Sequence, residues 1–471
     1  MEKFEGYIFT AFCSTNFLVS CLLFSKITRE QREPYMDEIF HVRQAQKYCY
    51  GKFNEWDPMI TTLPGLYLAS VGVIKPVVWL VDLTGKVVCS TEMLRFINLL
   101  FNCGILYLLY LIICKLHLKE KTASRRVLSA LSLSTFPVLY FFNFLYYTDA
   151  GSTFFILYTY LMTLYGCHKA SALISVFAIF FRQTNIIWVV FCASTIVANK
   201  MDETWRTEQS KKKDDKSPCQ IPFSVSGVKR VMRFLLEFLT TANHVKAVML
   251  VVWPYIFVAV GFIAFIVLND GIVVGDRSSH EACLNFPQLF YFFSFALFFS
   301  IPTSLCYHRA LRFLQTLKKH PLLYLLITGL CLLLVWKFTF VHKYLLADNR
   351  HFPFYVWKRI FQKHEVVRFA LIPAYVFAAW NFMDTLKSRS LFWSLAFLVC
   401  LLGATVPQKL LEFRYFIVPY LLYRLHMPLP SLTRLVLEFL FYTAINAATL
   451  YIFINKTFQW PNSPAVQRFM W

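Results

Sequence analysis

The sequence lacks the short motifs of the common nucleotide- and metal-dependent enzymes. It contains no glycine-rich phosphate loop, no HExxH pair, no CxxC pair and no GxSxG element. ATP hydrolysis, nucleotide-sugar binding and a structural metal therefore have no support in it. Its 13 cysteines show neither metal nor disulfide spacing, and most lie in apolar runs. We expect them to be small core residues.

A soluble catalytic domain is missing as well. Hydrophobic residues make up 58% of the 471 residues, more than the roughly 50% that soluble domains contain. Continuous apolar runs, each close to the ~20 residues that cross a bilayer, recur from one end to the other. We predict an all-α polytopic membrane protein with about 13 (12–14) transmembrane helices. The first helix is expected to be a retained span, not a cleaved signal peptide.

Acidic residues are scarce, 26 against 47 basic ones, which gives a formal net charge of +21. In a soluble protein this excess would suggest nucleic-acid binding. Here the basic residues lie in loops between apolar runs, where Lys and Arg keep loops in the cytosol. We therefore expect membrane lipid and no nucleic acid as a partner, and a cytosolic N-terminus.

The basic loops also predict the domain organisation. The apolar run 63–81 contains Pro64, Gly65 and Pro76, so we expect it to lie on the surface or re-enter the membrane. A full span there, with about 14 in total, is the alternative. The predicted parts are an N-terminal membrane module (1–199) with a large non-cytosolic loop (26–94), a cytosolic basic linker (200–245), and a C-terminal membrane module (246–471) with non-cytosolic loops near 269–287, 342–365 and 407–415.

Polar segments of unusual composition fall on the non-cytosolic side in this topology. Ionisable groups at membrane depth cost free energy and usually have a function, so we expect a site on this side. The segments are 35–41 (YMDEIFH), 146–152 (YYTDAGS), 181–185 (FRQTN), 275–282 (GDRSSHEA), 346–359 (LADNRHFPFYVWKR) and 411–419 (LEFRYFIVP).

Two adjacent carboxylates, Asp37 and Glu38, follow the first apolar run. One carboxylate beside a cavity could accept the proton of a hydroxyl group in a transition state. Burial would raise its pKa, and a neighbouring cation such as Arg43 would lower it. An amphipathic surface helix with solvated charges explains the same residues equally well.

Single charges also occur in or beside later apolar runs. Asp149 could cap a helix or take part in catalysis. Arg182 could bind a phosphate or form an ion pair with Asp149. Arg350 and His351, among aromatic residues, could hold a phosphate or touch lipid headgroups. Arg414 could contact a phosphate or form a local ion pair with the acidic residue two positions earlier.

These segments carry a resemblance to a known family. An acidic pair in the loop after the first span, preceded by an aromatic residue, is similar to that of the GT-C class of polytopic glycosyltransferases. The run PYMDEIFHVRQAQKYCYGKFNEWDPMITTLPGLYL, with YYTDAGS, FRQTN, DNRHFPFYVWKR and EFRYFIVP, is far more specific. It resembles the α-1,2-glucosyltransferases that add the last glucose to the dolichol-linked oligosaccharide of the endoplasmic reticulum. The resemblance covers essentially the whole chain except 200–245.

The resemblance implies a donor, an acceptor and a reaction. The donor is dolichyl-phosphate-glucose, and the acceptor is the diglucosylated dolichyl-pyrophosphate oligosaccharide. The glucose goes onto the 2-hydroxyl of the acceptor's terminal glucose. A β-linked donor and an α-linked product imply inversion in one displacement, without a covalent intermediate. The resemblance further implies an endoplasmic reticulum membrane location, a luminal active site and no cofactor, with a divalent metal generally not required.

The same resemblance implies roles for the acidic pair. Asp37 would be the general base, and Glu38 would orient it or bind acceptor hydroxyls. The leaving phosphate needs cations more than a general acid. Charge and predicted sidedness give Arg350, His351, Arg414 and Arg182 as candidates for the donor phosphate and Asp149, His41 and Tyr35 for other substrate contacts.

A polytopic transporter or channel-associated membrane protein without catalysis is the alternative. A transporter would bury charges at the bilayer midplane in broken helices. Arg182 is the main residue so placed, and most other distinctive charges lie in predicted loops, which favours an interfacial enzyme. A mannosyltransferase of the same class also fits, because neither spacing nor charge separates glucose from mannose.

Overall fold

The computed structural model describes residues 3–80, 89–120, 122–211, 225–277, 282–461 and 464–471. Within these ranges the chain is almost entirely helical, as predicted, with one short β-ribbon. The elements are α1 (Lys3–Glu30), α2 (Glu38–Cys49), α3 (Gly65–Leu80), α4 (Thr91–Leu116), α5 (Ala123–Ser134), α6 (Pro137–Phe142), α7 (Asp149–Leu164), α8 (His168–Phe181), η1 (Gln183–Asn185), α9 (Ile186–Lys211), α10 (Val225–Thr240), α11 (Ala242–Asn269), α12 (Pro287–Phe299), α13 (Ile301–Ser304), α14 (Tyr307–Lys319), α15 (Pro321–Phe338), α16 (Lys343–Ala347), α17 (Phe352–Val356), η2 (Trp357–Phe361), α18 (Glu365–Ala370), α19 (Ile372–Thr385), η3 (Leu386–Ser388), α20 (Leu391–Thr405), η4 (Phe413–Phe416), α21 (Ile417–His426), α22 (Leu432–Asn455), β1 (Thr457–Gln459) and β2 (Val466–Arg468).

Seven helical stretches of the described chain are long and apolar enough to cross a bilayer. They are Phe4–Glu30, Thr91–Leu116, Gln183–Glu208, Ala242–Asn269, Pro321–Phe338, Glu365–Ser388 and Leu432–Asn455. Four more apolar helices, α3, α8, α12 and α20, have 10–17 residues. The chain is therefore an all-α polytopic membrane protein. The count of about 13 spans stays a prediction, as does the partial insertion of 63–81.

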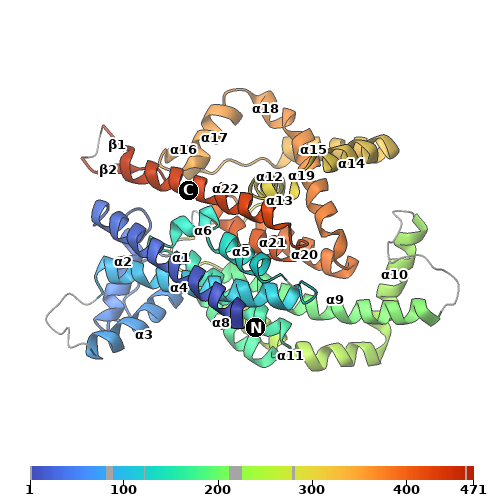
Figure 1. Ribbon diagram of the computed structural model, residues 1–471, viewed down its shortest axis with the longest axis horizontal. Helices are drawn as coiled ribbons and strands as arrows, with labels where there is room; N and C mark the ends of the chain where they lie inside the picture. Colours follow the sequence, from blue (N-terminus) through green and yellow to red (C-terminus); the bar gives the residue numbers. More distant parts are fainter. Residues whose placement is uncertain (1–2, 81–88, 121, 212–224, 278–281, 462–463) are drawn as a thin grey trace.

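Helices from both halves of the chain build the main core. In the first half α4 packs against α5 and α7. From the second half, α20 packs on α9, and α22 lies across α5 and α6 (Figure 1). The ring of Phe136 stacks on that of Tyr420, with 4.7 Å between the centroids. The two predicted membrane modules thus share one packed interior.

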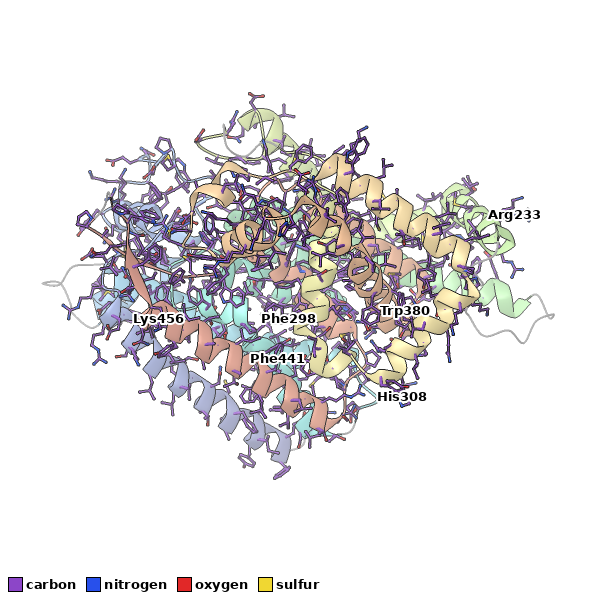
Figure 2. The ribbon with its side chains drawn as sticks, turned by 90° about the horizontal axis from the view of Figure 1, so that it is seen from above. Arg233, Phe298, His308, Trp380, Phe441 and Lys456 are labelled. Atoms are coloured by element: carbon purple, nitrogen blue, oxygen red, sulfur yellow. A yellow bond between two sulfur atoms is a disulfide. The ribbon has the colours of Figure 1, made fainter. Side chains whose placement is uncertain are left out.

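The predicted linker 200–245 begins and ends with helices. The long helix α9 continues to Lys211, and α10 follows at 225. Phe234 of α10 packs edge-on against Trp205 of α9, with 4.8 Å between the ring centroids. Arg233, on the same helix, lies at the edge of the molecule in Figure 2. Residues 212–224 of the linker lie outside the described ranges.

A disulfide fastens the first loop. Cys49, the last residue of α2, is bonded to Cys89, just before α4. The expectation that the cysteines are unpaired core residues is therefore wrong for these two. Their sequence separation of 40 gives no local signal, because packing of α2 and α3 brings them together. Disulfides persist in oxidising compartments, which is consistent with a non-cytosolic position of this loop.

The loop after α11 holds the first loop from the other half of the chain. The Asp276 N–H donates to the Pro58 carbonyl at 2.8 Å, and the Val274 N–H donates to the Thr61 carbonyl at 3.3 Å. Between them Gly275 has a φ of +81°, and a Cβ there would lie 2.4 Å from the Pro58 oxygen. Only glycine fits this contact. Residues 278–281 of the predicted segment 275–282 lie outside the described ranges.

The β-ribbon joins three distant parts of the sequence beside the end of α22 (Figure 1). A parallel bridge pairs Met470, just after β2, with His351. Arg468 of β2 donates to the Phe453 carbonyl at the end of α22 at 2.8 Å. The Tyr35 hydroxyl donates to the Arg468 carbonyl at 2.8 Å. The ribbon therefore connects the polar segment 346–359 to the acidic first loop.

Candidate active site

The acidic pair lies in a tight turn between α1 and α2. Met36 has a φ of +59°, which is uncommon for a residue with a side chain. Asp37 follows as the N-cap residue of α2. The exposed fraction of the Asp37 side chain is 49%, whereas that of Glu38 is 0%. The turn thus gives the two neighbouring carboxylates opposite surroundings.

The Asp37 carboxylate faces cationic groups. Its Oδ2 lies 3.4 Å from Nη2 of Arg414, and its main-chain N–H donates to the Tyr147 hydroxyl at 3.3 Å. Burial by itself would raise the pKa of this carboxyl. The charge of Arg414, with those of His41 and His351 in their protonated forms, more than offsets that effect and holds the pKa below its usual value. Asp37 is therefore ionised at neutral pH and able to accept a proton.

Two arginines meet on one buried carboxylate next to Asp37. Asp149, in the first turn of α7, lies 3.1 Å from Nη2 of Arg182 and 3.8 Å from Nη1 of Arg414. Arg414 also pairs with Glu412 at 2.7 Å. Both ion pairs that the sequence offered as alternatives to phosphate binding are thus formed. A guanidinium group has five N–H donors, and the side chains of Arg182 and Arg414 remain 16% and 11% exposed, so both can still contact a ligand.

Arg350 and His351 form a second cationic group. Two nitrogens of Arg350 bind the Asp348 carboxylate, at 2.9 and 2.7 Å. Its guanidinium carbon lies 5.9 Å from the centroid of the Tyr35 ring. The His351 Nδ1 lies 2.7 Å from the main-chain oxygen of Trp471. His351 lies close enough to Asp37 to lower its pKa when the ring is protonated, so this group belongs to the same site.

Tyr35 and His41 flank the acidic pair on either side. Tyr35 is buried, and its hydroxyl is bonded to the main-chain N–H and carbonyl of Arg468, both at 2.8 Å. The His41 Nδ1 lies 2.6 Å from the Tyr67 hydroxyl. Burial lowers the pKa of His41 to about 4, against the opposing effect of the Asp37 charge. His41 is therefore neutral at neutral pH and can form hydrogen bonds without adding charge.

Glu38 is held by a residue that sequence reasoning missed. Arg95 of α4 is 0% exposed and binds both Glu38 oxygens, Nε to Oε1 at 2.8 Å and Nη2 to Oε2 at 2.7 Å. The Tyr35 N–H donates to Oε2 at 2.9 Å, and the Tyr146 N–H donates to Oε1 at 2.5 Å. Both oxygens of the Glu38 carboxylate are therefore bound by groups of the protein itself. A charge inside the apolar run 91–116 was the signal that could have indicated Arg95.

The structure therefore brings the predicted site residues into one region. Asp37, His41, Asp149, Arg182 and Arg414 lie together, and the second cationic group adjoins them through Tyr35. Among the described residues, no three His, Cys, Asp or Glu side chains are grouped as metal ligands would be. The independence from a metal stays a prediction. Tyr147 was missed because its segment carried no signal beyond Asp149.

Comparison with known proteins gives a family. Residues 31–425 match the model of the DIE2/ALG10 family. A mouse protein named Dol-P-Glc:Glc(2)Man(9)GlcNAc(2)-PP-Dol alpha-1,2-glucosyltransferase is 57% identical over the full length of both chains. A human protein of the same name is 56% identical, also over both full lengths. An Arabidopsis thaliana protein of that name is 34% identical over 93% of this chain and 95% of its own. No solved structure matches. This chain belongs to the DIE2/ALG10 family.

Proposed function

We propose that this protein transfers glucose from dolichyl-phosphate-glucose to the 2-hydroxyl of the terminal glucose of the diglucosylated dolichyl-pyrophosphate oligosaccharide. The observation that carries the proposal is the half-exposed Asp37 carboxylate, ionised beside Arg414, which shares the Asp149 carboxylate with Arg182. A base next to two guanidinium groups suits a reaction in which a hydroxyl displaces a phosphate. The names of the similar mouse, human and Arabidopsis thaliana proteins describe the same donor and acceptor.

The reaction is a single displacement at the anomeric carbon. The acceptor 2-oxygen attacks the face opposite the phosphate, and its O–H proton passes to the Asp37 carboxylate. The bond between the anomeric carbon and the phosphate oxygen breaks, and dolichyl phosphate leaves with the electron pair. Because attack and departure occur on opposite faces, a β-linked donor gives an α-linked product. The acceptor hydroxyl becomes strongly acidic as the new bond forms, so a carboxylate with a low pKa suffices as the base.

The cationic groups stabilise the departing phosphate. Arg414 and Arg182 share the Asp149 carboxylate, which fixes the distance between them. Fixed donors aimed at a developing negative charge need little reorganisation in the transition state. Arg350, whose guanidinium group lies over the ring of Tyr35, and His351 add further N–H groups to this site. The reaction as written uses no cofactor and no divalent metal, so chelation of metal ions is expected to leave the rate unchanged.

We further propose an endoplasmic reticulum location with the N-terminus in the cytosol and the active site in the lumen. The bond between Cys49 and Cys89 supports an oxidising compartment for the first loop. The basic loops on the opposite side support the orientation. Protease protection of epitope tags in sealed microsomes tests it. A tag before α1 should be digested and a tag at exposed Lys52 should be protected; the reverse result excludes the orientation.

The experiment that tests the reaction uses microsomes without endogenous activity. The protein is added, and the lipid-linked oligosaccharides are sized with dolichyl-phosphate-glucose present, omitted, or replaced by dolichyl-phosphate-mannose. Conversion of the diglucosylated to the triglucosylated species only with the glucose donor supports the proposal. An unchanged diglucosylated species excludes it and favours a membrane protein without this catalysis. Transfer from the mannose donor identifies a different enzyme of the same class.

A further inference from the structure

The turn that carries Asp37 is fixed at both ends by one buried ion pair. Glu38 accepts the N–H of Tyr35, three residues before it, so the carboxylate closes the turn on itself. Arg95 holds that carboxylate with two nitrogens and also donates to the Gln31 carbonyl at 2.6 Å. A further Arg95 contact reaches the Glu33 carbonyl at 3.2 Å. One arginine therefore binds the segment leading into the turn and the residue leaving it.

Between these two attachments the backbone adopts an unfavourable conformation. Met36 lies in the left-handed region, with a φ of +59°. A side chain disfavours this region, and such a conformation persists where the surrounding structure imposes it. The ties from Glu38 and Arg95 are the contacts that impose it here.

We propose that Arg95 and Glu38 act as a clamp that positions Asp37 for proton transfer. This inference rests on the proposed function. The backbone at Asp37 is fixed, because Tyr35 before it and Glu38 after it are both held. Its N–H is further fixed by the Tyr147 hydroxyl at 3.3 Å. The clamp makes no contact with the reacting atoms, so Arg95 and Glu38 are positioning residues.

Loss of the clamp should raise the pKa of Asp37, which loss of a merely structural contact would not do. In the clamped turn the Asp37 carboxylate lies 3.4 Å from Arg414, whose charge, with those of His41 and His351 in their protonated forms, holds its pKa down. The hydroxyls of Tyr147 and Tyr415 are further titratable groups near this carboxylate. A turn released from the clamp lets the carboxylate leave this cationic surrounding. The pKa of Asp37 then rises, and the base becomes protonated at a higher pH.

The test compares E38Q and R95K with a matched control, E438Q. Glu438 is also 0% exposed and bound by two nitrogens of one arginine, Arg424, both at 2.8 Å, but it lies away from the turn. Each full-length protein is purified and reconstituted, and kcat, KM and the pH profile are measured per folded molecule. Trypsin cleavage after the exposed Arg32 reports the order of the turn without reference to activity.

The clamp predicts a 10- to 100-fold loss of kcat in E38Q with KM close to that of the wild type. R95K keeps the charge but lacks the fork of two donors, so its kcat should lie between that of E38Q and that of the wild type. The wild-type rate should be flat above about pH 5, because an aspartate with an ordinary or lower pKa is ionised there. E38Q should show a new acid limb above that pH and faster cleavage after Arg32. E438Q should show neither change.

A folded E38Q with the wild-type kcat, pH profile and cleavage rate overturns the clamp. Where E38Q fails to fold, the apolar double variant R95M/E38M leaves no unpaired buried charge. It still lacks the ties to the turn, so a wild-type kcat in this variant overturns the clamp as well. Absence of glucosyl transfer in the wild type is failure of the proposed function, and the cleavage comparison then decides the clamp alone: faster cleavage in E38Q supports it, and equal cleavage excludes it.

Discussion

Two buried arginine–glutamate pairs stabilise different regions of this protein. Arg95 and Glu38 join α4 to the turn before α2, and Arg424 and Glu438 join α21 to α22. In each pair one arginine binds both carboxylate oxygens at 2.7–2.8 Å, and neither partner exceeds 1% exposure. By burial and pairing geometry the two are nearly equivalent.

The difference lies in what each carboxylate binds besides its arginine. Glu38 accepts two main-chain N–H groups, from Tyr35 and Tyr146. The contacts of Arg424 with Glu438 connect side chains alone and join two regular helices. The first pair therefore fixes a piece of irregular backbone, whereas the second holds helices that their own hydrogen bonds already shape. The same chemistry serves positioning in one region and packing in the other.

Breaking either pair by one substitution should produce the largest effect on stability. R95M and R424M each leave a glutamate buried without its partner, which costs about 3–5 kcal/mol of unfolding free energy. Thermal unfolding in detergent should show a large fall in Tm for both. A Tm close to wild type in R424M would show that the Glu438 carboxylate reaches water when its partner is lost, and the two regions would no longer be equivalent in stability.

Removal of Arg414 tests the site itself, because its main expected effect is on activity. R414M takes away a guanidinium that the proposed transition state uses, and kcat should fall by about 10²–10³. The pKa of Asp37 should rise, because the charge that lowers it most is gone while burial remains. The acid limb of the pH profile should therefore move to higher pH. R277M, on an exposed loop, is the control; an equal loss of kcat in that variant would contradict a specific role.

The disulfide fastens the same loop at a point that lies farther from Asp37 than the Arg95–Glu38 pair does. C49S/C89S removes a link across 40 residues, which is typically worth about 2–4 kcal/mol of stability. We expect a lower Tm but the wild-type kcat per folded molecule at 25 °C, because the bond lies at the far end of α2. A loss of kcat comparable to that of E38Q would show that the whole loop, and not the turn alone, positions the base.

Met36 should give the smallest effect. Glycine adopts positive φ without the side-chain penalty, which offsets its greater flexibility in the unfolded chain, so M36G should change stability by no more than about 1 kcal/mol. Isoleucine is β-branched and poorly compatible with this φ, so M36I should be roughly 1–2 kcal/mol less stable than M36G. The two Tm values, measured side by side, check the order. Equal values would mean that the turn is not left-handed at this residue.

The sequence predicted the helical membrane architecture because apolar runs report directly on burial in lipid. It also predicted that the polar segments lie on one side of the membrane, which stays a prediction, and the structure brings those around Asp37 together. Arg182 and Asp149 form the ion pair that the sequence named as one of two readings. Residue type alone could not choose between that pair and phosphate binding, since a guanidinium can do both.

The contacts that sequence could not supply are those between distant segments. The disulfide partners are 40 residues apart, and Arg95 lies 57 positions after Glu38. No periodicity connects such residues, because tertiary packing alone determines the pairing. The opposite surroundings of Asp37 and Glu38 follow from the rotation of about 100° between neighbouring residues at the start of α2, and the positive φ at Met36 that precedes them has no signal in the sequence, because methionine rarely adopts it.

The most direct test of the central claim is the rate of the chemical step in D37N. The purified, reconstituted wild type and D37N are mixed with saturating donor and acceptor at pH 7, and a single turnover is followed by sizing the lipid-linked product. Asparagine cannot accept the proton, so the account predicts a fall of about 10²–10⁴ in the rate, with Tm close to wild type. A folded D37N that forms the triglucosylated product at the wild-type rate would show that Asp37 is not the base.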